Sequence, residues 1–294
     1  LKDLIITLLG DVRDELFVRD SLKTHNVNII FHCAAYKHVP LVELNPLQGI
    51  SNNVFSTLNL CKCAQMQSID IFMLISSDKA VRPMNVMGAS KRLSELVVQA
   101  YAQESLSTQY KSTAYTMVRF GNVLGSSGSV VPIFQEQISN GGPIKITDLS
   151  IIRYFMTISE AAELVIQSAG LAKGGEVFLL DMGKPVRIID LAYQMIALNG
   201  LTVKNSDNPN GDIEIVVTGL RPGEKLFEEL LIDAESIPTS HPLIFKAKEK
   251  SIPFSTLMPQ LLKLKEQVNK QKLNDSLDTL SKLVPEWNNS KRNL

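Results

Sequence analysis

The stretch IDIFMLIS at residues 69–76 decides the fold of this chain. It has the length and apolar content of a buried strand. A stretch of helical period follows at residues 86–104, and another apolar run follows at residues 113–119. Strand-length runs that alternate with helical stretches are typical of parallel strands joined by crossover helices. We therefore expect an α/β fold built on a doubly wound parallel sheet.

The same alternation extends toward the N-terminus. The expected elements are a buried strand at 4–9, a helix at 14–25, a strand at 27–32 and a long helix at 46–67. Leu1 leads directly into the first of these strands, without an initiating methionine or a signal peptide. We therefore expect the sequence to begin partway through a domain, with the first strand, helix and strand of the sheet missing.

After about residue 121 the pattern changes to glycine-rich loops and shorter elements. We expect helices at 130–139, 159–171, 188–199, 257–270 and 276–283, and strands at 144–147, 176–180 and 213–218. The chain is accordingly divided into three parts. These are a partial doubly wound domain at 1–125, a smaller mixed α/β lobe interleaved with the sheet at 126–250, and a polar helical C-terminal tail at 251–294.

The composition favours a small molecule or another protein as partner. The 294 residues include 30 basic and 30 acidic side chains, and this zero net charge argues against a dedicated nucleic-acid-binding protein. No stretch reaches the roughly 18 to 20 apolar residues of a membrane span. Three cysteines are too few for a disulfide framework, so we expect a reducing cytoplasm. Cys61 and Cys63 are expected on a helix and not in a metal site, because no second pair accompanies them.

The loop after the strand at 69–76 carries the most informative polar residues. Ser77, Asp78 and Lys79 follow that strand, and Met87 and Lys91 lie one turn apart on the next helix. This spacing is that of the serine, tyrosine and lysine of short-chain dehydrogenases, with methionine at the position of the proton-transferring tyrosine. Because a thioether cannot exchange a proton, either the site is inactive or a neighbour of Met87 transfers the proton.

Two further loops follow expected strands, where ligands of doubly wound folds bind. Asp11 either caps the next helix or accepts a hydrogen bond from an adenine amino group, and both interpretations stay open. Ala34 and Ala35 are small enough to let a ligand approach the backbone. Close packing of a helix on the sheet would select the same two residues.

Seven segments between residue 10 and about residue 233 carry a family resemblance. They are GDVRD at 10–14, AYKHVP at 35–40, SDKAV at 77–81, NVMGASKR at 85–92, RFGNV at 119–123, RYFMT at 153–157 and LRPGEK at 220–225. In this order they resemble the CapD-like polysaccharide-biosynthesis family of extended short-chain dehydrogenases, whose best-known members are UDP-N-acetylglucosamine 4,6-dehydratases. A branch of that family has methionine at the position of Met87.

The resemblance implies a Rossmann-like fold, with NAD bound at 1–125 and substrate bound by the lobe at 126–250. It also implies a nucleotide-sugar 4,6-dehydratase that works through an internal redox cycle. NAD takes a hydride from carbon 4, water is lost across carbons 5 and 6, and the hydride returns to carbon 6. This reaction needs a base and an acid, which we assign to Lys79 and Asp78. The other interpretation of this pair is a surface turn with a weak ion pair.

The resemblance also implies three groups of site residues. The catalytic group is Ser77, Asp78, Lys79, Met87 and Lys91; the cofactor group is Asp11, Val12, Ala34, Ala35 and Lys91; the substrate group is Lys37, Asn122, Lys145, Arg153, Arg221 and Glu224. Without the family match, Asn122 would be a turn asparagine and Arg221 a surface arginine before a Pro-Gly turn. With it, we expect Asn122 to bind the diphosphate or sugar, and Arg221 to bind the diphosphate at two points.

Two other functions stay open as alternatives to the dehydratase. A nucleotide-sugar epimerase would share the fold and NAD, but it would carry a proton-relay tyrosine where Met87 stands. The family that the sequence resembles has a glycine-rich loop that binds the NAD pyrophosphate, and this sequence has no such loop before its first expected helix. This favours a non-catalytic fragment, because without the loop the chain should bind NAD poorly. We further expect a cytoplasmic homo-oligomer that binds a UDP-sugar and no nucleic acid. We expect no membrane segment in this chain, although longer family members are tethered to the cytoplasmic face of the membrane.

Overall fold

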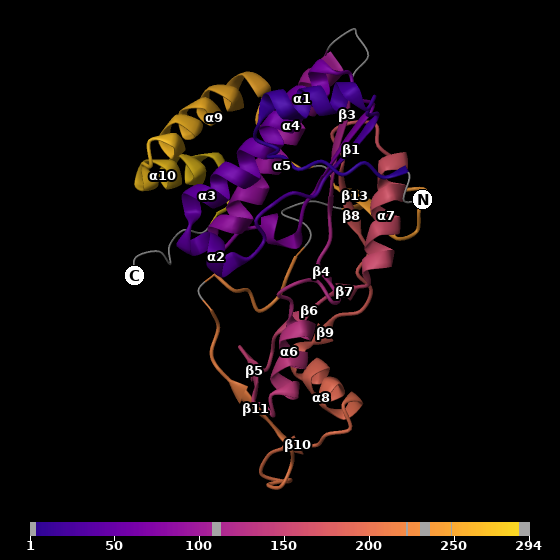
Figure 1. The fold of residues 1–294 in the computed structure, drawn as a ribbon, viewed down its shortest axis with the longest axis vertical. Coiled ribbons are helices and arrows are strands. Elements are labelled where there is room, and N and C mark those ends of the chain that lie inside the picture. The colour runs from indigo at the N-terminus through magenta and orange to yellow at the C-terminus, as the bar shows by residue number, and fades with distance from the viewer. Residues whose placement is uncertain (1–3, 108–112, 222, 230–235, 248, 288–294) are drawn as a thin grey trace.

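The computed structural model describes residues 4–107, 113–221, 223–229, 236–247 and 249–287. Its main sheet has six strands in the order β1-β2-β3-β8-β13-β12 (Figure 1). The strands are β1 (Ile29–His32), β2 (Ile71–Ile75), β3 (Ala114–Arg119), β8 (Val177–Leu180), β12 (Ser236–Pro238) and β13 (Ile244–Ala247). The first four strands in this order are parallel, as predicted. β13 and β12 continue the sheet in antiparallel fashion, which the sequence does not predict.

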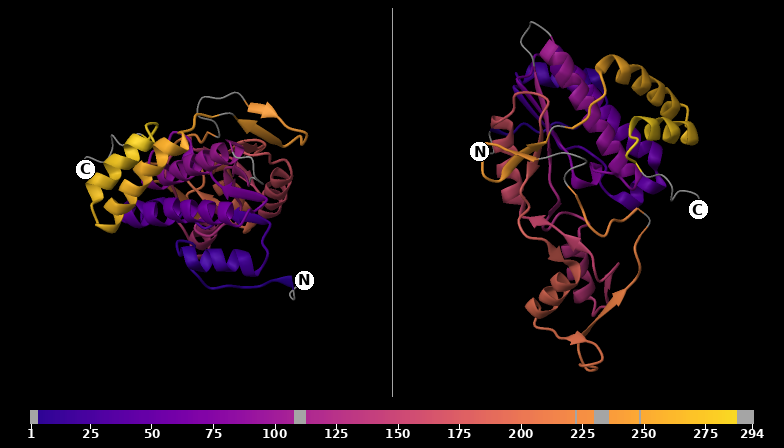
Figure 2. Two further views of the ribbon diagram at one scale, coloured as in Figure 1. Left: turned by 90° about the horizontal axis from the view of Figure 1, so that it is seen from above. Right: turned by 180° about the vertical axis from the view of Figure 1, so that it is seen from behind.

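Helices cover both faces of the sheet (Figures 1 and 2). α4 (Ser56–Met66) and α5 (Val86–Ser107) lie on one face, and α7 (Ile158–Gly170) lies on the other. β2 shows how the sequence divides its side chains between them. Phe72 and Leu74 belong to the main hydrophobic cluster on the α4 and α5 side, whereas Met73 belongs to the cluster under α7. This alternation is the period of two expected for a strand that is buried on both faces.

The long helix expected at 46–67 is present in three joined parts. These are α3 (Pro46–Ile50), a π-helical segment at Ser51–Phe55, and α4. Buried Asn53 of the π-helical segment accepts a hydrogen bond from the backbone N–H of Tyr36 (2.7 Å) and donates to the carbonyl of Tyr36 (3.1 Å) and to Ser90 Oγ (2.9 Å). One amide side chain therefore joins the loop after β1 to α5.

The prediction of a strand at 4–9 is wrong. Residues 5–10 form no strand, and Leu9 is fully exposed. The run has the apolar content of a buried strand, but a strand also needs a neighbour for its backbone hydrogen bonds. Among the described residues this run pairs with no strand, and β1, at the edge of the sheet, pairs with β2 alone. The helix after it, α1 (Glu15–Thr24), forms as expected.

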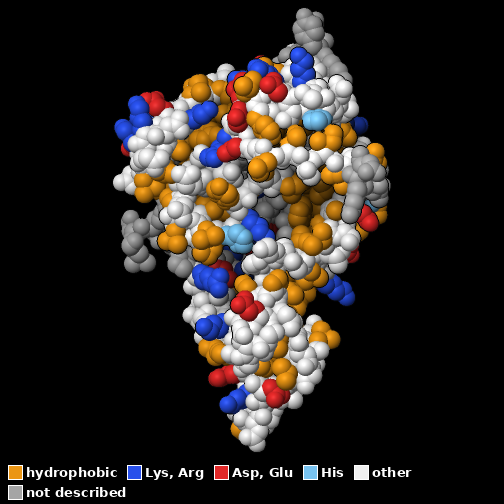
Figure 3. Space-filling model, in the orientation of Figure 1, with side chains coloured by type: hydrophobic (Ala, Val, Ile, Leu, Met, Phe, Trp, Pro, Cys, Tyr) orange, Lys and Arg blue, Asp and Glu red, His pale blue; other side chains and the backbone are white. Residues whose placement is uncertain are grey.

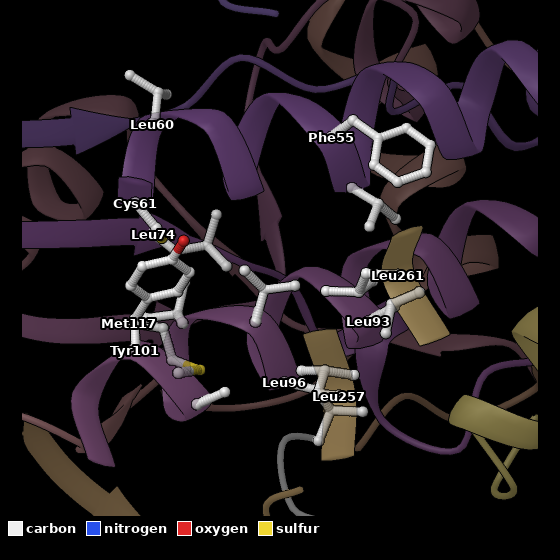
Figure 4. Packing of buried hydrophobic residues seen from close by; sticks show 14 of the residues in the cluster. Phe55, Leu60, Cys61, Leu74, Leu93, Leu96, Tyr101, Met117, Leu257 and Leu261 are labelled. Carbon is white, nitrogen blue, oxygen red and sulfur yellow. The ribbon is translucent and has the colours of Figure 1, made fainter. Parts of the chain in front are cut away.

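The C-terminal helices pack on α5, although the segment at 251–294 has a polar composition. They are α9 (Phe254–Asn269) and α10 (Leu273–Leu283). Figure 4 shows Leu257 and Leu261 of α9 close to Leu93 and Leu96 of α5, and all four are buried in the main cluster. A helix needs only one apolar stripe to dock.

Five charged side chains form an ion network at α5, of which four are buried and Glu286 is partly exposed. Arg119 at the end of β3 contacts Glu95 of α5 (Nη2 to Oε2, 2.5 Å) and Glu249 (Nη1 to Oε1, 2.5 Å). Arg92 of α5 contacts Glu95 (3.0 Å), Glu249 (3.2 Å) and Glu286 (2.7 Å). The network therefore ties β3 and α5 to the segments that precede α9 and follow α10.

A smaller lobe lies at the lower end of the elongated molecule in Figure 1. It has its own hydrophobic cluster around a parallel three-stranded sheet in the order β10-β11-β5. Its elements are α6 (Val130–Ser139), β5 (Ile144–Ile146), α8 (Ile188–Leu198), β10 (Val203–Lys204) and β11 (Ile213–Val217). Short paired strands lie between the lobe and the main sheet: β4 (Asn122–Val123) with β7 (Phe155–Met156), and β6 (Ile152–Arg153) with β9 (Val186–Arg187). The domain boundaries at 125 and 250 stay a prediction.

Figure 3 shows basic and acidic side chains interspersed over the face that it presents. Among the helices in the described residues, none is long and apolar enough to cross a membrane.

A short helix, α2 (Val39–Leu44), lies between the loop after β1 and α3.

Candidate active site

Ser77, Asp78 and Lys79 lie at the carboxyl end of β2, where Asp78–Ala80 forms a short 3-10 turn. Ser77 caps this turn, because its Oγ accepts a hydrogen bond from the Lys79 N–H (3.2 Å) and donates to Asp78 Oδ1 (2.7 Å). The Asp78 N–H donates to the carbonyl of Phe120, just after β3. The ends of two neighbouring strands therefore fix these residues at the edge where doubly wound folds bind ligands.

Lys79 lies between two carboxylates. Its Nζ is 3.1 Å from Asp78 Oδ1 and 3.1 Å from Glu228 Oε1. Glu228 also lies 3.3 Å from Arg153 Nε and accepts a hydrogen bond from Asn122 Nδ2 (3.3 Å). Four predicted residues thus meet around Glu228, a residue that no sequence motif indicates. The interpretation of Asp78 and Lys79 as a surface turn is wrong, because the Asp78 side chain is 2% exposed.

The surroundings shift the pKa of each ionisable group in this cluster. Burial raises the pKa of Glu228 to about 7, against the opposing effect of the Lys79 charge. Burial also disfavours the charged form of Asp78, but the Lys79 ammonium and hydrogen bonding with Glu228 and Ser77 hold the pKa of Asp78 below its usual range. Burial lowers the pKa of Lys79, yet the two carboxylates outweigh it and raise that pKa above its ordinary value. Near neutral pH, Glu228 is therefore the member of the cluster that titrates.

A cavity of about 550 Å³ opens beside this cluster, within the size range of small-molecule sites. Predicted residues that line it are Asp78, Lys79, Asn122, Arg153, Arg221 and Glu224. Pro40 and Leu44 form part of another wall. The fold thus gathers residues from the loops after β2 and β3 and from the segment after β11 around one space.

A second cavity, of about 580 Å³, also borders Asp78 and Glu228. Gly121 lines it, and a Cβ at Gly121 would lie 3.4 Å from Asp78 Oδ2 and 3.3 Å from Met182 Cε. Glycine therefore keeps the space in front of this carboxylate open. Within the part of the chain that the structure describes, Asp78 Oδ2 is buried without a hydrogen-bond partner. A buried acceptor of this kind is available to a ligand.

Two of the predicted substrate residues also hold the cavity wall together. The Arg153 guanidinium donates to the carbonyls of Ile152 (2.9 Å), Leu226 (3.1 Å) and Lys225 (2.7 Å). These bonds fasten the segment after Arg221 to β6. Glu224 closes the turn in that segment, because it accepts hydrogen bonds from Thr147 Oγ1 (3.0 Å) and from the Arg221 N–H (3.1 Å).

Other predicted residues lie away from the described lining of this cavity. Lys145 is exposed on β5 of the smaller lobe, and Lys37 is exposed in the loop after β1. Asp11 is exposed and pairs with Arg13 (2.6 Å), whose hydrogen bonds lower the pKa of Asp11 to about 2. The interpretation of Asp11 as a helix cap is wrong, because Asp14 caps α1. Val12 is half-buried, and its carbonyl accepts a hydrogen bond from Asn59 (2.7 Å).

Met87 and Lys91 lie one turn apart on α5, and both side chains are buried. Met87 packs in the main hydrophobic cluster. Lys91 Nζ donates to the Ile75 carbonyl at the end of β2 (2.6 Å), and burial lowers the pKa of Lys91 to about 8. Lys91 also interacts electrostatically with Cys33, which precedes exposed Ala34 and the half-buried Ala35. The ammonium therefore lies near an accessible stretch of backbone after β1.

Comparison with known proteins identifies related sequences. Residues 1–249 match a family model described as polysaccharide biosynthesis protein. The chain is 46% identical over 233 residues to capsular polysaccharide biosynthesis protein CapD of Staphylococcus aureus, covering 79% of this chain and 37% of CapD. It is 34% identical to UDP-glucose 4-epimerase of Rickettsia rickettsii (77% of this chain, 62% of the epimerase). It is 31% identical to the inverting UDP-N-acetylglucosamine 4,6-dehydratase of Campylobacter jejuni (78% and 63%). The chain thus spans from just over a third to under two thirds of these relatives' lengths.

Solved structures resemble most of this chain. Pen from Bacillus thuringiensis matches with a TM-score of 0.70 at 33% identity, covering 87% of this chain and 81% of Pen. DesIV, a dTDP-glucose 4,6-dehydratase from Streptomyces venezuelae solved with NAD and TYD bound, matches with a TM-score of 0.62 at 21% identity, covering 74% and 68%. These likenesses confirm the expected Rossmann-like fold.

Proposed function

Because the chain belongs to the polysaccharide biosynthesis protein family, we propose that it forms part of a nucleotide-sugar 4,6-dehydratase acting on UDP-N-acetylglucosamine. Relatives named as an epimerase and as a dehydratase support the broader class of nucleotide-sugar enzymes. The observation that carries the dehydratase is the placement of Asp78 and Lys79 side by side at one cavity. Elimination of water needs two such groups, a base that takes the hydrogen of carbon 5 and an acid that protonates the hydroxyl leaving the neighbouring carbon 6.

NAD is the proposed cofactor, and the residues present fit it. The Lys91 ammonium suits ribose hydroxyls, the small Ala34 and Ala35 leave room beside the backbone, and the exposed Asp11 carboxylate can accept from an adenine amino group. When bound, NAD would supply reversible hydride transfer to and from the sugar and would end unchanged. The acid-base steps of the proposed reaction, including the protonation that lets water leave carbon 6, are carried out by side chains of this chain.

Asp78 and Lys79 have separate tasks in this proposal. Ionised Asp78, whose Oδ2 is unpartnered among the described residues, takes the proton of the carbon 4 hydroxyl and delivers it to the hydroxyl that leaves carbon 6. Lys79 takes the hydrogen of carbon 5 and returns a proton to that carbon at the end. Asp78 therefore replaces the tyrosine that a thioether at position 87 cannot imitate.

The test is to incubate the full-length protein, loaded with NAD, with UDP-N-acetylglucosamine and to weigh the product by mass spectrometry. We expect a product lighter by one water, formed without net accumulation of NADH. An isomer of unchanged mass would instead indicate the epimerase. Steady accumulation of NADH would contradict an internal redox cycle, and unchanged substrate would favour a binding protein.

Arg221→Lys is expected to raise the KM for UDP-N-acetylglucosamine while changing kcat little. Arg221 is exposed, lines the cavity and follows β11. Lysine keeps the charge but loses the planar two-point contact with a diphosphate, and a loss of uniform binding appears in KM. Steady-state kinetics measure both constants. Arg187→Lys is the matched control, because Arg187 lies on β9 and forms an exposed pair with Asp190 of α8. An unchanged KM in Arg221→Lys would place Arg221 outside the substrate site.

A further inference from the structure

Glu228 is the residue on which the charged cluster converges, yet the proposed reaction gives it no task. Its Oε1 faces Lys79 Nζ (3.1 Å) and Arg153 Nε (3.3 Å), and its Oε2 faces Asn122 Nδ2 (3.3 Å). These donors come from the turn after β2, from β6 and from β4. The Glu228 side chain is 8% exposed, and such a buried carboxylate is costly unless charged or polar partners compensate it.

Lys79 must be a neutral amine before it can take the hydrogen of carbon 5. In the structure it is placed as an ammonium, since two carboxylate oxygens lie 3.1 Å from its Nζ and its pKa is raised. One proton therefore has to leave Lys79, and Asp78 and Glu228 are the acceptors in contact with it. Asp78 is the poorer acceptor, because Ser77 already donates to the same Oδ1 atom and the pKa of Asp78 is lowered.

We propose that Glu228 takes the proton that Lys79 must lose, so that the ammonium and carboxylate become an amine and a carboxylic acid when substrate fills the cavity. The inference rests on the proposed function. An N–H bond of Lys79 breaks and an O–H bond of Glu228 forms, and the net charge of the pair stays zero. The Lys79 side chain is 32% exposed. Substrate in the cavity would exclude solvent water from this exposed part. Loss of water disfavours both charged forms, which drives the transfer.

The other charged groups around Glu228 leave this role to Lys79. Arg153 contacts the same carboxylate, but a guanidinium does not give up its proton in proteins. Lys225 acts on Glu228 electrostatically, and its Nζ donates to the Val81 carbonyl (2.6 Å). Asp78 is an acid that already lacks its proton. After turnover, Glu228 returns its proton to Lys79, which resets the pair.

Glu228→Gln tests the transfer, because glutamine keeps the shape and an acceptor oxygen but cannot take the proton. In a single turnover of the full-length, NAD-loaded protein with UDP-N-acetylglucosamine, we expect the NADH absorbance to appear as in the parent. It should then persist, since elimination slows by about 100 to 10,000-fold. The residual rate should keep rising with pH, because Lys79 can then lose its proton only to solvent. The rate of elimination in the parent should stop rising once the pH exceeds the pKa of Glu228, which is about 7.

Glu229→Gln is the matched control. Glu229 is the next residue, is exposed, and pairs with Arg82 at 3.1 Å. This variant should follow the parent at every pH. If Glu228→Gln instead lowers the rate by one constant factor across the pH range, or leaves it unchanged, Glu228 does not receive the proton and the proposal is overturned.

Chemical labelling gives a readout that needs no turnover. Acetylation of Lys79 by acetic anhydride is followed by mass spectrometry as a function of pH, without substrate. Loss of one of the two carboxylates should lower the pKa of Lys79, so the labelling curve of Glu228→Gln should shift to lower pH than that of the parent or Glu229→Gln. An unshifted curve overturns the proposal. A shifted curve in a protein that fails to dehydrate UDP-N-acetylglucosamine refutes the proposed function and leaves the coupling of Lys79 to Glu228 standing.

Discussion

Lys79→Met is expected to abolish the elimination of water while leaving the first hydride transfer nearly intact. Methionine has similar length but cannot take the hydrogen of carbon 5, and loss of one acid-base group typically costs about 100 to 10,000-fold in rate. Removal of the ammonium also takes away the positive charge between Glu228 and Asp78, while the negative charge of Asp78 stays. Glu228 should therefore hold a proton. In a single turnover with UDP-N-acetylglucosamine, NADH absorbance should appear and persist, while the dehydrated product stays below detection.

The matched control for this variant is Lys62→Met. Lys62 is exposed on α4 and pairs with Glu15 at 2.8 Å, so this change should leave turnover as it is. A companion variant, Asp78→Asn, should block the reaction one step earlier, because the proton of the carbon 4 hydroxyl then has no acceptor, so NADH absorbance should fail to appear. Normal turnover in either Lys79→Met or Asp78→Asn would remove both assignments.

The sequence predicts those parts of the candidate site that lie close together along the chain. Ser77, Asp78 and Lys79 follow a strand and precede a helix, and this order alone places them at the carboxyl edge of a parallel sheet. Glu228 could not be found in this way, because it is 106 positions from Asn122. Its neighbour Glu229 has the same side chain but pairs with Arg82 at the surface. Only the tertiary fold distinguishes the two glutamates.

The same limit explains where the expected fold differs from the structure. The run at 4–9 has the composition of a buried strand, but burial requires a partner strand that composition cannot reveal. The opposite difference appears at 251–294, where a polar composition hides the leucines that dock α9 on α5. Local periodicity predicts the type of an element well, and it does not predict what covers that element.

Arg119→Met is expected to lower the free energy of unfolding by about 3 to 5 kcal/mol, the usual cost of breaking a buried ion pair on one side. The Arg119 side chain is inaccessible and contacts Glu95 and Glu249, which would keep Arg92 as a common partner. Urea-induced unfolding of parent and variant measures the loss. Arg187→Met, at an exposed site, is the control and should stay within about 0.5 kcal/mol of the parent.

The pH dependence of this loss shows whether charge or packing causes it. Burial raises the pKa of Glu95, but Arg119 and Arg92 outweigh burial and hold that pKa at about 2, below its ordinary value of 4.5. Glu95 therefore contributes stability that is fully present above about pH 4.5 and is lost as the pH falls toward 2. In Arg119→Met the pKa of Glu95 should rise, so that acid neutralises the uncompensated carboxylate earlier. The difference in unfolding free energy between parent and variant should then narrow as the pH is lowered toward 4.5. A difference that stays constant with pH would mean that Arg119 stabilises the fold by packing alone.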